Sequence, residues 1–282
     1  MKEKYCQYYN PNAINEINLD NELVYFLKAT DSIVKHLVKM QSEIKKDYLL
    51  ALEKRLSDQI KDYKINLQVQ DLTDLQSKIE FIQDNEDLMN KIILFICMQY
   101  ELPAKINLES GKVEVKSMGV IKAMRRLSYY RVKAFADVFG KEKGIQLYKQ
   151  ILAKISLEIR NKSKEEETVT VVSKNKDQLK AWKEFGLANF TFTFIDKDQI
   201  IYRFDKCIVH EALKDLNDPD IAYIASCYGA DIEEFNHGRI VCLRRAKTLH
   251  HWDYCDELYW DKRVHPNPEH PTLYFIENIG KE

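Results

Sequence analysis

Cysteine and histidine side chains gather in the last third of this chain. The chain has six cysteines and seven histidines in 282 residues, and four of each fall between residues 207 and 255. These residues are Cys207, His210, Cys227, His237, Cys242, His250, His251 and Cys255. Thiolates and imidazoles can hold Zn²⁺, which activates water, and a thiolate beside a histidine can attack an electrophilic carbon. We therefore expect the protein's chemistry between about residues 207 and 260.

The spacing of these residues does not decide between the two chemistries. The sequence contains neither C-x-x-C nor H-E-x-x-H. A free cysteine is also among the most buried residue types, so each thiol has a packing explanation. Cys242 lies in an apolar run, residues 240–243, and is expected to be core. Cys207, Cys227 and Cys255 remain as candidate zinc ligands.

Two pairs of side chains define the predicted site more closely. Cys227 and Asp231 stand one turn apart and share a helix face if the helix continues through Gly229. Cys255 and Glu257 alternate along a predicted strand and share one of its faces. One thiolate activated by a neighbouring histidine could attack an electrophilic carbon, with Asp231 orienting or shuttling a proton.

An alternating segment predicts a β-hairpin next to this site. Phe190, Phe192 and Phe194 alternate with threonines, a polar turn follows at residues 196–198, and alternation resumes over residues 200–204. A helix is expected after Asp218-Pro219, and two strands are expected at residues 239–248 and 254–261. The C-terminal part therefore has the predicted order β-β-α-β-β.

The preceding part of the chain shows helical periodicity. Apolar residues recur every three or four positions over residues 20–63, 71–100, 118–139 and 144–161. Helices followed by strands indicate an α+β protein in which a small antiparallel sheet packs against helices. We expect an N-terminal helical region at residues 1–117 and an α+β domain at residues 118–282. The N-terminal helices could also support a homo-oligomer.

Composition narrows the classes of partner. Lys plus Arg (43) and Asp plus Glu (44) nearly cancel, so the net charge of -1 gives no reason to expect nucleic acid binding. The longest apolar run, residues 92–98, is far shorter than the roughly 20 residues that cross a bilayer. No apolar segment of the secretory type follows Met1. We expect a cytoplasmic protein with reduced thiols and a small-molecule substrate.

Three segments of the C-terminal part resemble one family. They are Cys227-Tyr228-Gly229-Ala230-Asp231, residues 241–249 with Arg244 and Thr248-Leu249, and Asp253-Tyr254-Cys255-Asp256-Glu257. Together they resemble the L-2-amino-thiazoline-4-carboxylic acid hydrolase family, and Cys207 is similar to a further cysteine of its pattern. The likeness covers about residues 189–261. Where the family usually has glycine before the last cysteine, this chain has His250-His251-Trp252.

The resemblance implies the hydrolytic opening of a cyclic amidine, with cleavage of a C–N bond that leaves a carbamoyl amino acid. Cys227 or Cys255 would act as nucleophile or metal ligand, with Asp231 as proton shuttle. His250 or His251 would act as acid, base or ligand. Arg244 would bind the substrate carboxylate, and Cys207 would also line the substrate site.

Two other functions fit the same sequence. The order of helices, hairpin and cysteines is also similar to 4-vinyl reductase-type small-molecule-binding domains, in which cysteines can hold structural zinc. That likeness implies a sensor or carrier that catalyses nothing. A helical scaffold whose C-terminal domain has lost its chemistry is the third possibility. Metal content and an open or occluded pocket distinguish the three.

Overall fold

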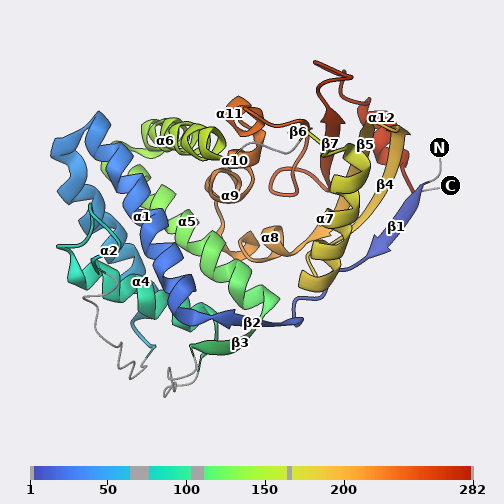
Figure 1. Cartoon of the computed structure of the whole chain (residues 1–282). Coiled ribbons are helices and arrows are strands. Elements are labelled where there is room, and N and C mark those ends of the chain that lie inside the picture. Colours follow the sequence, from blue (N-terminus) through green and yellow to red (C-terminus); the bar gives the residue numbers. More distant parts are fainter. Residues whose placement is uncertain (1–2, 64–75, 103–110, 164–166, 281–282) are drawn as a thin grey trace. The chain divides into compact units, whose positions relative to one another are not determined.

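A computed structural model describes residues 3–63, 76–102, 111–163 and 167–280 (Figure 1). The chain forms two compact units, one of residues 14–155 and the other of residues 1–13 with 156–282. The predicted boundary between residues 117 and 118 differs from this division, which falls inside helix α6 (Lys141–Lys162).

The unit of residues 14–155 is built from helices and one small two-stranded sheet. Its elements are β2 (Ile14–Asn18), α1 (Leu19–Met40), η1 (Ser42–Ile44), α2 (Lys45–Ile60), α4 (Glu86–Gln99), β3 (Lys112–Lys116), α5 (Ser117–Phe139) and the first part of α6. Phe135 anchors its core, with ring centroids 4.5 Å from Tyr48 and 5.5 Å from Tyr148. The helical prediction is confirmed over α1, α2 and α4, whereas residues 77–85 form turns and irregular backbone before α4 begins. None of the described helices is long and apolar enough to cross a membrane.

The other unit contains a five-stranded antiparallel sheet with the strand order β1-β4-β5-β7-β6. The strands are β1 (Lys4–Gln7), β4 (Ala188–Asp196), β5 (Gln199–Cys207), β6 (Val241–Arg244) and β7 (Cys255–Asp261). The α+β class is confirmed, and so is the order β-β-α-β-β after residue 188. The sequence analysis missed strand β1, which joins the sheet from the start of the chain.

The predicted hairpin is strands β4 and β5. Phe190 pairs with Phe204 and Phe192 with Tyr202, so the aromatic residues of both strands share one face. Trp182 packs on this face from α7 (Val171–Phe185), with its ring centroid 5.1 Å from Phe190 and 5.2 Å from Tyr202. The hairpin positions one buried sheet face against a helix, although α7 was not predicted.

The opposite face of the sheet packs on the end of the chain. Cys242, Leu258 and Trp260 form a buried cluster there with Ile276 of α12 (Leu273–Asn278). The prediction that Cys242 belongs to the core is therefore confirmed, since its exposed fraction is 3%. Strand β7 thus separates two interiors, and its alternate side chains enter each of them.

Short helices connect β5 to β6. They are α8 (Ile208–Glu211), η3 (Lys214–Leu216), α9 (Pro219–Ser226), α10 (Tyr228–Asp231) and α11 (Glu233–Asn236). The Asp218 side chain accepts the Ile221 amide at 3.3 Å and caps α9, as the sequence predicts. The helix nevertheless ends at Ser226, and Cys227 stands between α9 and α10. Cys227 and Asp231 are therefore not one turn apart on a continuous helix.

Candidate functional site

Arg245 is the centre of a buried group of charges. Its Nη1 atom lies 2.7 Å from Asp231 Oδ1, and its Nε atom lies 3.1 Å from Glu257 Oε1. Its Nη2 atom also donates to Glu257 Oε1. The side chains of Arg245, Asp231 and Glu257 are only 11%, 13% and 11% exposed. We call these three residues the arginine cluster.

Two tyrosines complete the hydrogen bonding of the arginine cluster. Tyr223 of α9 donates to Asp231 Oδ2 at 3.0 Å, and Tyr259 of β7 donates to Glu257 Oε2 at 2.7 Å. All four carboxylate oxygens of the cluster therefore accept a hydrogen bond. Such bonds are what make buried charges tolerable, because desolvation otherwise costs several kcal/mol for each ion.

The surroundings leave Asp231 as a carboxylate that can exchange its proton. Burial raises the pKa of Asp231 above its usual value and Glu257 adds to this, although Arg245 and Tyr223 oppose it. Burial alone would lower the pKa of Arg245, but Glu257 and Asp231 hold it well above the ordinary value. The cluster therefore joins a permanent cation to a carboxyl group whose pKa is shifted towards neutrality.

Three thiols surround this cluster. Cys227 accepts a hydrogen bond from Arg245 Nη1 at its carbonyl oxygen, 3.2 Å away. Cys207 ends β5, Cys255 begins β7, and both thiols interact electrostatically with Cys227 and with Glu257. Burial raises the pKa of Cys207 to about 11 and that of Cys255 well above its ordinary value. These two sulfurs are therefore neutral thiols near pH 7.

The structure does not arrange these thiols as a metal site. Within the described part of the chain, no group of three or more His, Cys, Asp or Glu residues is placed to hold a metal ion. The zinc site predicted from Cys207, Cys227 and Cys255 is therefore corrected. The thiols gather at the arginine cluster, where Arg245 donates to the carbonyl oxygen of Cys227 and also interacts electrostatically with its thiol.

The two candidate histidines lie in different surroundings. His250 Nε2 is 2.9 Å from the hydroxyl of Ser226, the residue before Cys227, and its ring centroid is 5.4 Å from that of His210. His251 is exposed, and its Nε2 lies 3.3 Å from Asp220 Oδ1. His250 is thus the histidine placed beside the Cys227 segment.

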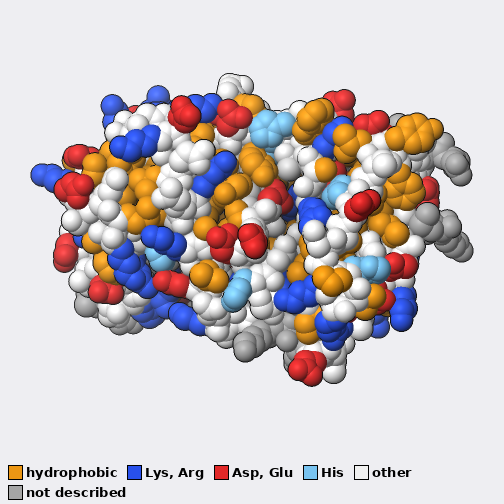
Figure 2. Space-filling view, turned by 90° about the horizontal axis from the view of Figure 1, so that it is seen from above, with side chains coloured by type: hydrophobic (Ala, Val, Ile, Leu, Met, Phe, Trp, Pro, Cys, Tyr) orange, Lys and Arg blue, Asp and Glu red, His pale blue; other side chains and the backbone are white. Residues whose placement is uncertain are grey.

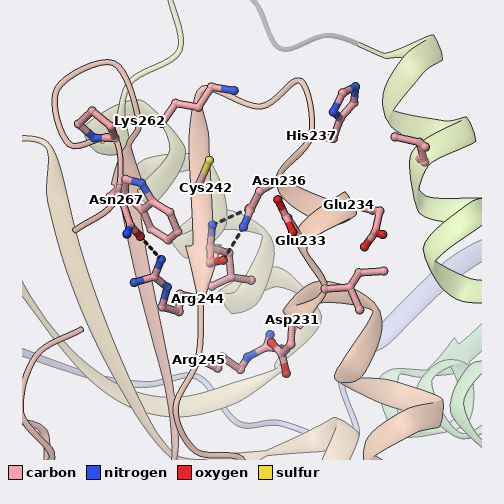
Figure 3. A pocket seen from close by; sticks show the side chains of 15 residues that line it. Asp231, Glu233, Glu234, Asn236, His237, Cys242, Arg244, Arg245, Lys262 and Asn267 are labelled. Atoms are coloured by element: carbon pink, nitrogen blue, oxygen red, sulfur yellow. Dashed lines mark hydrogen bonds and ion pairs between the residues drawn. The ribbon is translucent and has the colours of Figure 1, made fainter. Parts of the chain in front are cut away.

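A cavity of about 770 Å³ opens next to the arginine cluster (Figure 3). Asp231 and Arg245 lie at one end of it, and Glu233, Glu234 and His237 lie along one side. The opposite side is formed by residues that include Arg244, Lys262 and Asn267. The cavity therefore carries acidic and basic groups on different walls.

Of the two adjacent arginines, only Arg245 was missed by the sequence analysis. Arg244 lines the cavity, but its guanidinium is bound to Pro268 O and Asn267 Oδ1, both at 2.7 Å. The alternation of side chains along strand β6 could have indicated the position of Arg245. Leu243 pairs with Tyr259, so the residue two positions later falls on the same face, opposite Glu257.

Comparison of this chain with family models, curated proteins and solved structures finds no match. On the face drawn in Figure 2, Lys and Arg side chains are interspersed with Asp and Glu. That mixture agrees with the near-zero net charge. The arginine cluster and the cavity that it borders are therefore the features of this chain that indicate a function.

Proposed function

We propose that this protein is a hydrolase that opens a small cyclic amidine, or a related ring, at a C–N or C–S bond. One observation carries the proposal: Asp231, a buried carboxyl group with a raised pKa, is fixed by Arg245 at the end of a 770 Å³ cavity. A carboxyl group of this kind is suited to general acid–base work near neutral pH. The family resemblance of the segments around Cys227 and Cys255 agrees with it.

The proposed reaction uses Asp231 as a proton shuttle. Asp231 takes a proton from water while the water oxygen bonds to the amidine carbon of the ring. That proton passes to the ring nitrogen, which takes the electron pair of the C=N bond. The hydroxyl proton of the adduct then passes through Asp231 to the same nitrogen as the carbonyl group forms and the ring C–N bond breaks. One water is consumed, and a carbonyl group and a free amine are formed. Arg245 keeps its charge throughout and holds the carboxylate in position.

The walls of the cavity suit a substrate that carries both charges. Glu233 and Glu234 offer acidic groups for a protonated amidine, and Lys262 offers a cation for a carboxylate on the other side. We assign the carboxylate to Lys262 because the guanidinium of Arg244 already has two partners. A cyclic amidine carboxylate is small enough to lie within this space.

Attack by a thiol instead of water is tested at Cys227. Cys207 and Cys255 are neutral thiols near pH 7, whereas a nucleophilic cysteine must ionise. Cys227→Ser should therefore retain most of the turnover if water attacks. A loss of several orders of magnitude in that variant, with the fold intact, would assign the attack to the sulfur of Cys227.

The test is turnover of 2-aminothiazoline-4-carboxylate by the purified protein. Release of a primary amine reports C–N cleavage, and release of a thiol reports C–S cleavage. Asp231→Asn should lower kcat by about 10²–10⁴-fold, the usual contribution of general acid–base catalysis. Asp253→Asn, at an exposed acid in the turn before β7, is the matched control and should retain the wild-type rate. Equal rates in the two variants would exclude Asp231 from the reaction.

One observation favours a second function, that of a small-molecule-binding protein without catalysis. Both pKa-shifted thiols are protonated near pH 7, and every carboxylate oxygen of the arginine cluster already has a donor. Calorimetric binding of the same compound without any turnover would support this function. Neither binding nor turnover across a series of cyclic amidine carboxylates would reject both.

A further inference from the structure

The segment that follows strand β7 forms part of the cavity wall. Residues 262–272 link β7 to α12 through turns and irregular backbone, and we call them the strap. Pro266 and Asn267 of the strap line the 770 Å³ cavity (Figure 3). The position of the strap therefore affects the size and access of the cavity, whatever ligand the cavity takes.

Arg244 makes one of the ties that hold the strap. Its Nη1 atom donates to Pro268 O and its Nη2 atom to Asn267 Oδ1, both at 2.7 Å. The Arg244 side chain also lies over the Trp260 ring, 5.1 Å from the centroid. Because a guanidinium stays protonated at physiological pH, this tie does not respond to pH.

His270 makes a second tie, and that one can titrate. Its Nε2 atom lies 3.3 Å from Asp256 Oδ1, and its Nδ1 atom lies 3.0 Å from Pro271 O. A carboxylate and a carbonyl group are both acceptors, so both ring nitrogens must carry hydrogen to satisfy this arrangement. The Nε2–Asp256 contact is an ion pair outside hydrogen-bond geometry, and a protonated imidazole suits both of these neighbours.

Asp256 depends on this partner. Its exposed fraction is 0%, its Oδ1 atom also accepts the Ala246 amide at 2.8 Å, and its Oδ2 atom has no hydrogen-bond partner among the described residues. A neutral His270 keeps only one N–H, so a ring lone pair would face either the Asp256 carboxylate or the Pro271 carbonyl group, and the positive charge beside Asp256 would be lost. Either contact is repulsive, and the charge of Asp256 would be left without compensation.

We propose that His270 and Asp256 form a pH-sensitive latch that ties the strap to the sheet beside the cavity. With His270 protonated, the strap is held against strand β7. With His270 neutral, the strap loses this tie and remains attached through Arg244, Arg263 and His265. The latch acts on the cavity wall and does not depend on the proposed reaction.

The sign of the pH dependence follows from the groups that act on His270. Burial alone would lower its pKa, but Asp256 on β7 outweighs burial and raises it, while Arg244 on β6 opposes the increase. A raised pKa means that the latch is complete below the unfolded value of about 6.5. It is lost as the pH rises through the higher pKa of the folded state.

Hydrogen exchange of the strap amides tests this latch in the full-length protein. Protection is measured between pH 6 and pH 9 and divided by the intrinsic exchange rate at each pH. In the wild-type protein, protection of the strap peptides should fall by about tenfold over this range, the order expected for losing one charged hydrogen bond. Peptides from strands β4 and β5 report whether the sheet itself is unchanged.

Two variants remove the titration in different ways. Asp256→Asn keeps an acceptor for the Ala246 amide and removes the negative charge that pairs with a protonated His270, so strap protection should no longer fall with rising pH. His270→Gln is neutral at every pH, and its strap protection should also be independent of pH. His265→Gln is the matched control in the same strap, because His265 Nε2 lies 3.1 Å from the more exposed Asp196. This control should keep the wild-type pH dependence.

Two results would overturn the latch. One is strap protection in the wild-type protein that does not change between pH 6 and pH 9. The other is the same pH dependence in Asp256→Asn and His270→Gln as in the wild type. Either result would show that the strap does not respond to the charge of His270.

Discussion

Strand β7 carries two successive buried acids, and the two faces of the sheet treat them differently. Glu257 faces the interior with Arg245 and Tyr259, and both of its oxygens accept hydrogen bonds. Asp256 faces the opposite interior, where His270 is its ionisable partner and one oxygen has no partner among the described residues. The charge of Glu257 is thus compensated by Arg245, which is always a cation, whereas the charge of Asp256 is compensated by His270, which can lose its proton.

The face with Arg245 should therefore keep its ion pairs as the pH changes, whereas the face with His270 should respond to pH. Arg245 stays charged, and Asp231 is the carboxyl group of the arginine cluster whose pKa burial raises above its ordinary value. On the other face the cation itself can lose its charge. The comparison implies that one face holds a chemical group in position, whereas the other controls how firmly a cavity wall is held.

Arg245→Met should have the largest effect on stability. It leaves Asp231 and Glu257 buried without a counter-charge, and breaking a buried ion pair in this way costs about 3–5 kcal/mol. Urea denaturation followed by far-UV circular dichroism measures the free energy of unfolding. A loss below about 1 kcal/mol would mean that the cluster is not buried as the structure has it.

The triple variant Arg245→Met, Asp231→Asn, Glu257→Gln is the control for that effect. It removes all three charges, so much of the lost stability should return. A triple variant no more stable than Arg245→Met would assign the loss to packing of the arginine side chain instead of to its charge.

His270→Gln should have an intermediate effect that depends on pH. At pH 6 the variant should be less stable than the wild type by about 2 kcal/mol, the contribution of a hydrogen bond to a charged group. The difference should shrink as the pH rises through the raised pKa of His270, because the wild type then loses the same interaction. Unfolding in urea at several pH values measures it, and a difference that grows with pH would contradict the account.

Tyr259→Phe should cost less, about 1 kcal/mol, because it removes one hydrogen bond to Glu257 and leaves Arg245 in place. The same unfolding measurement applies. A loss as large as that of Arg245→Met would mean that the tyrosine, and not the arginine, compensates the buried carboxylate.

His251→Gln should have the smallest effect, within about 0.5 kcal/mol, since its contact with Asp220 is exposed. Turnover of 2-aminothiazoline-4-carboxylate should also be unchanged, because His251 lies away from the Ser226–His250 contact. A large loss of turnover with normal stability would return His251 to the candidate site.

The sequence predicted what depends on local periodicity. Alternating phenylalanines predicted the hairpin. The alternation of β7 predicted that Cys255 and Glu257 share one face, and in the structure Cys255 lies in the core on that face with Tyr259, which donates to Glu257. The end of α9 at Ser226 was harder to predict, because the glycine three positions after it only weakens a helix.

What the sequence did not reveal depends on long-range pairing. Strand β1 is four residues long and joins the sheet about 180 positions away from its partner, β4. His270 meets Asp256 through a strap without regular structure, so no period relates the two residues. Arg245 could have been found by extending the alternation of β6, but its importance emerges only from the two acids that converge on it.

In the proposed reaction, Asp231 is the carboxyl group that exchanges a proton at the cavity. The pKa of Asp231 can be measured directly. Carboxyl ¹³C chemical shifts across a pH titration give the midpoints of Asp231 and of Asp261, which serves as the internal reference. The midpoint of Asp231 should lie above the ordinary value of about 3.9. That of Asp261 should lie below it, because Arg263 donates to its carboxylate. A midpoint for Asp231 at or below that of Asp261 would contradict the central claim.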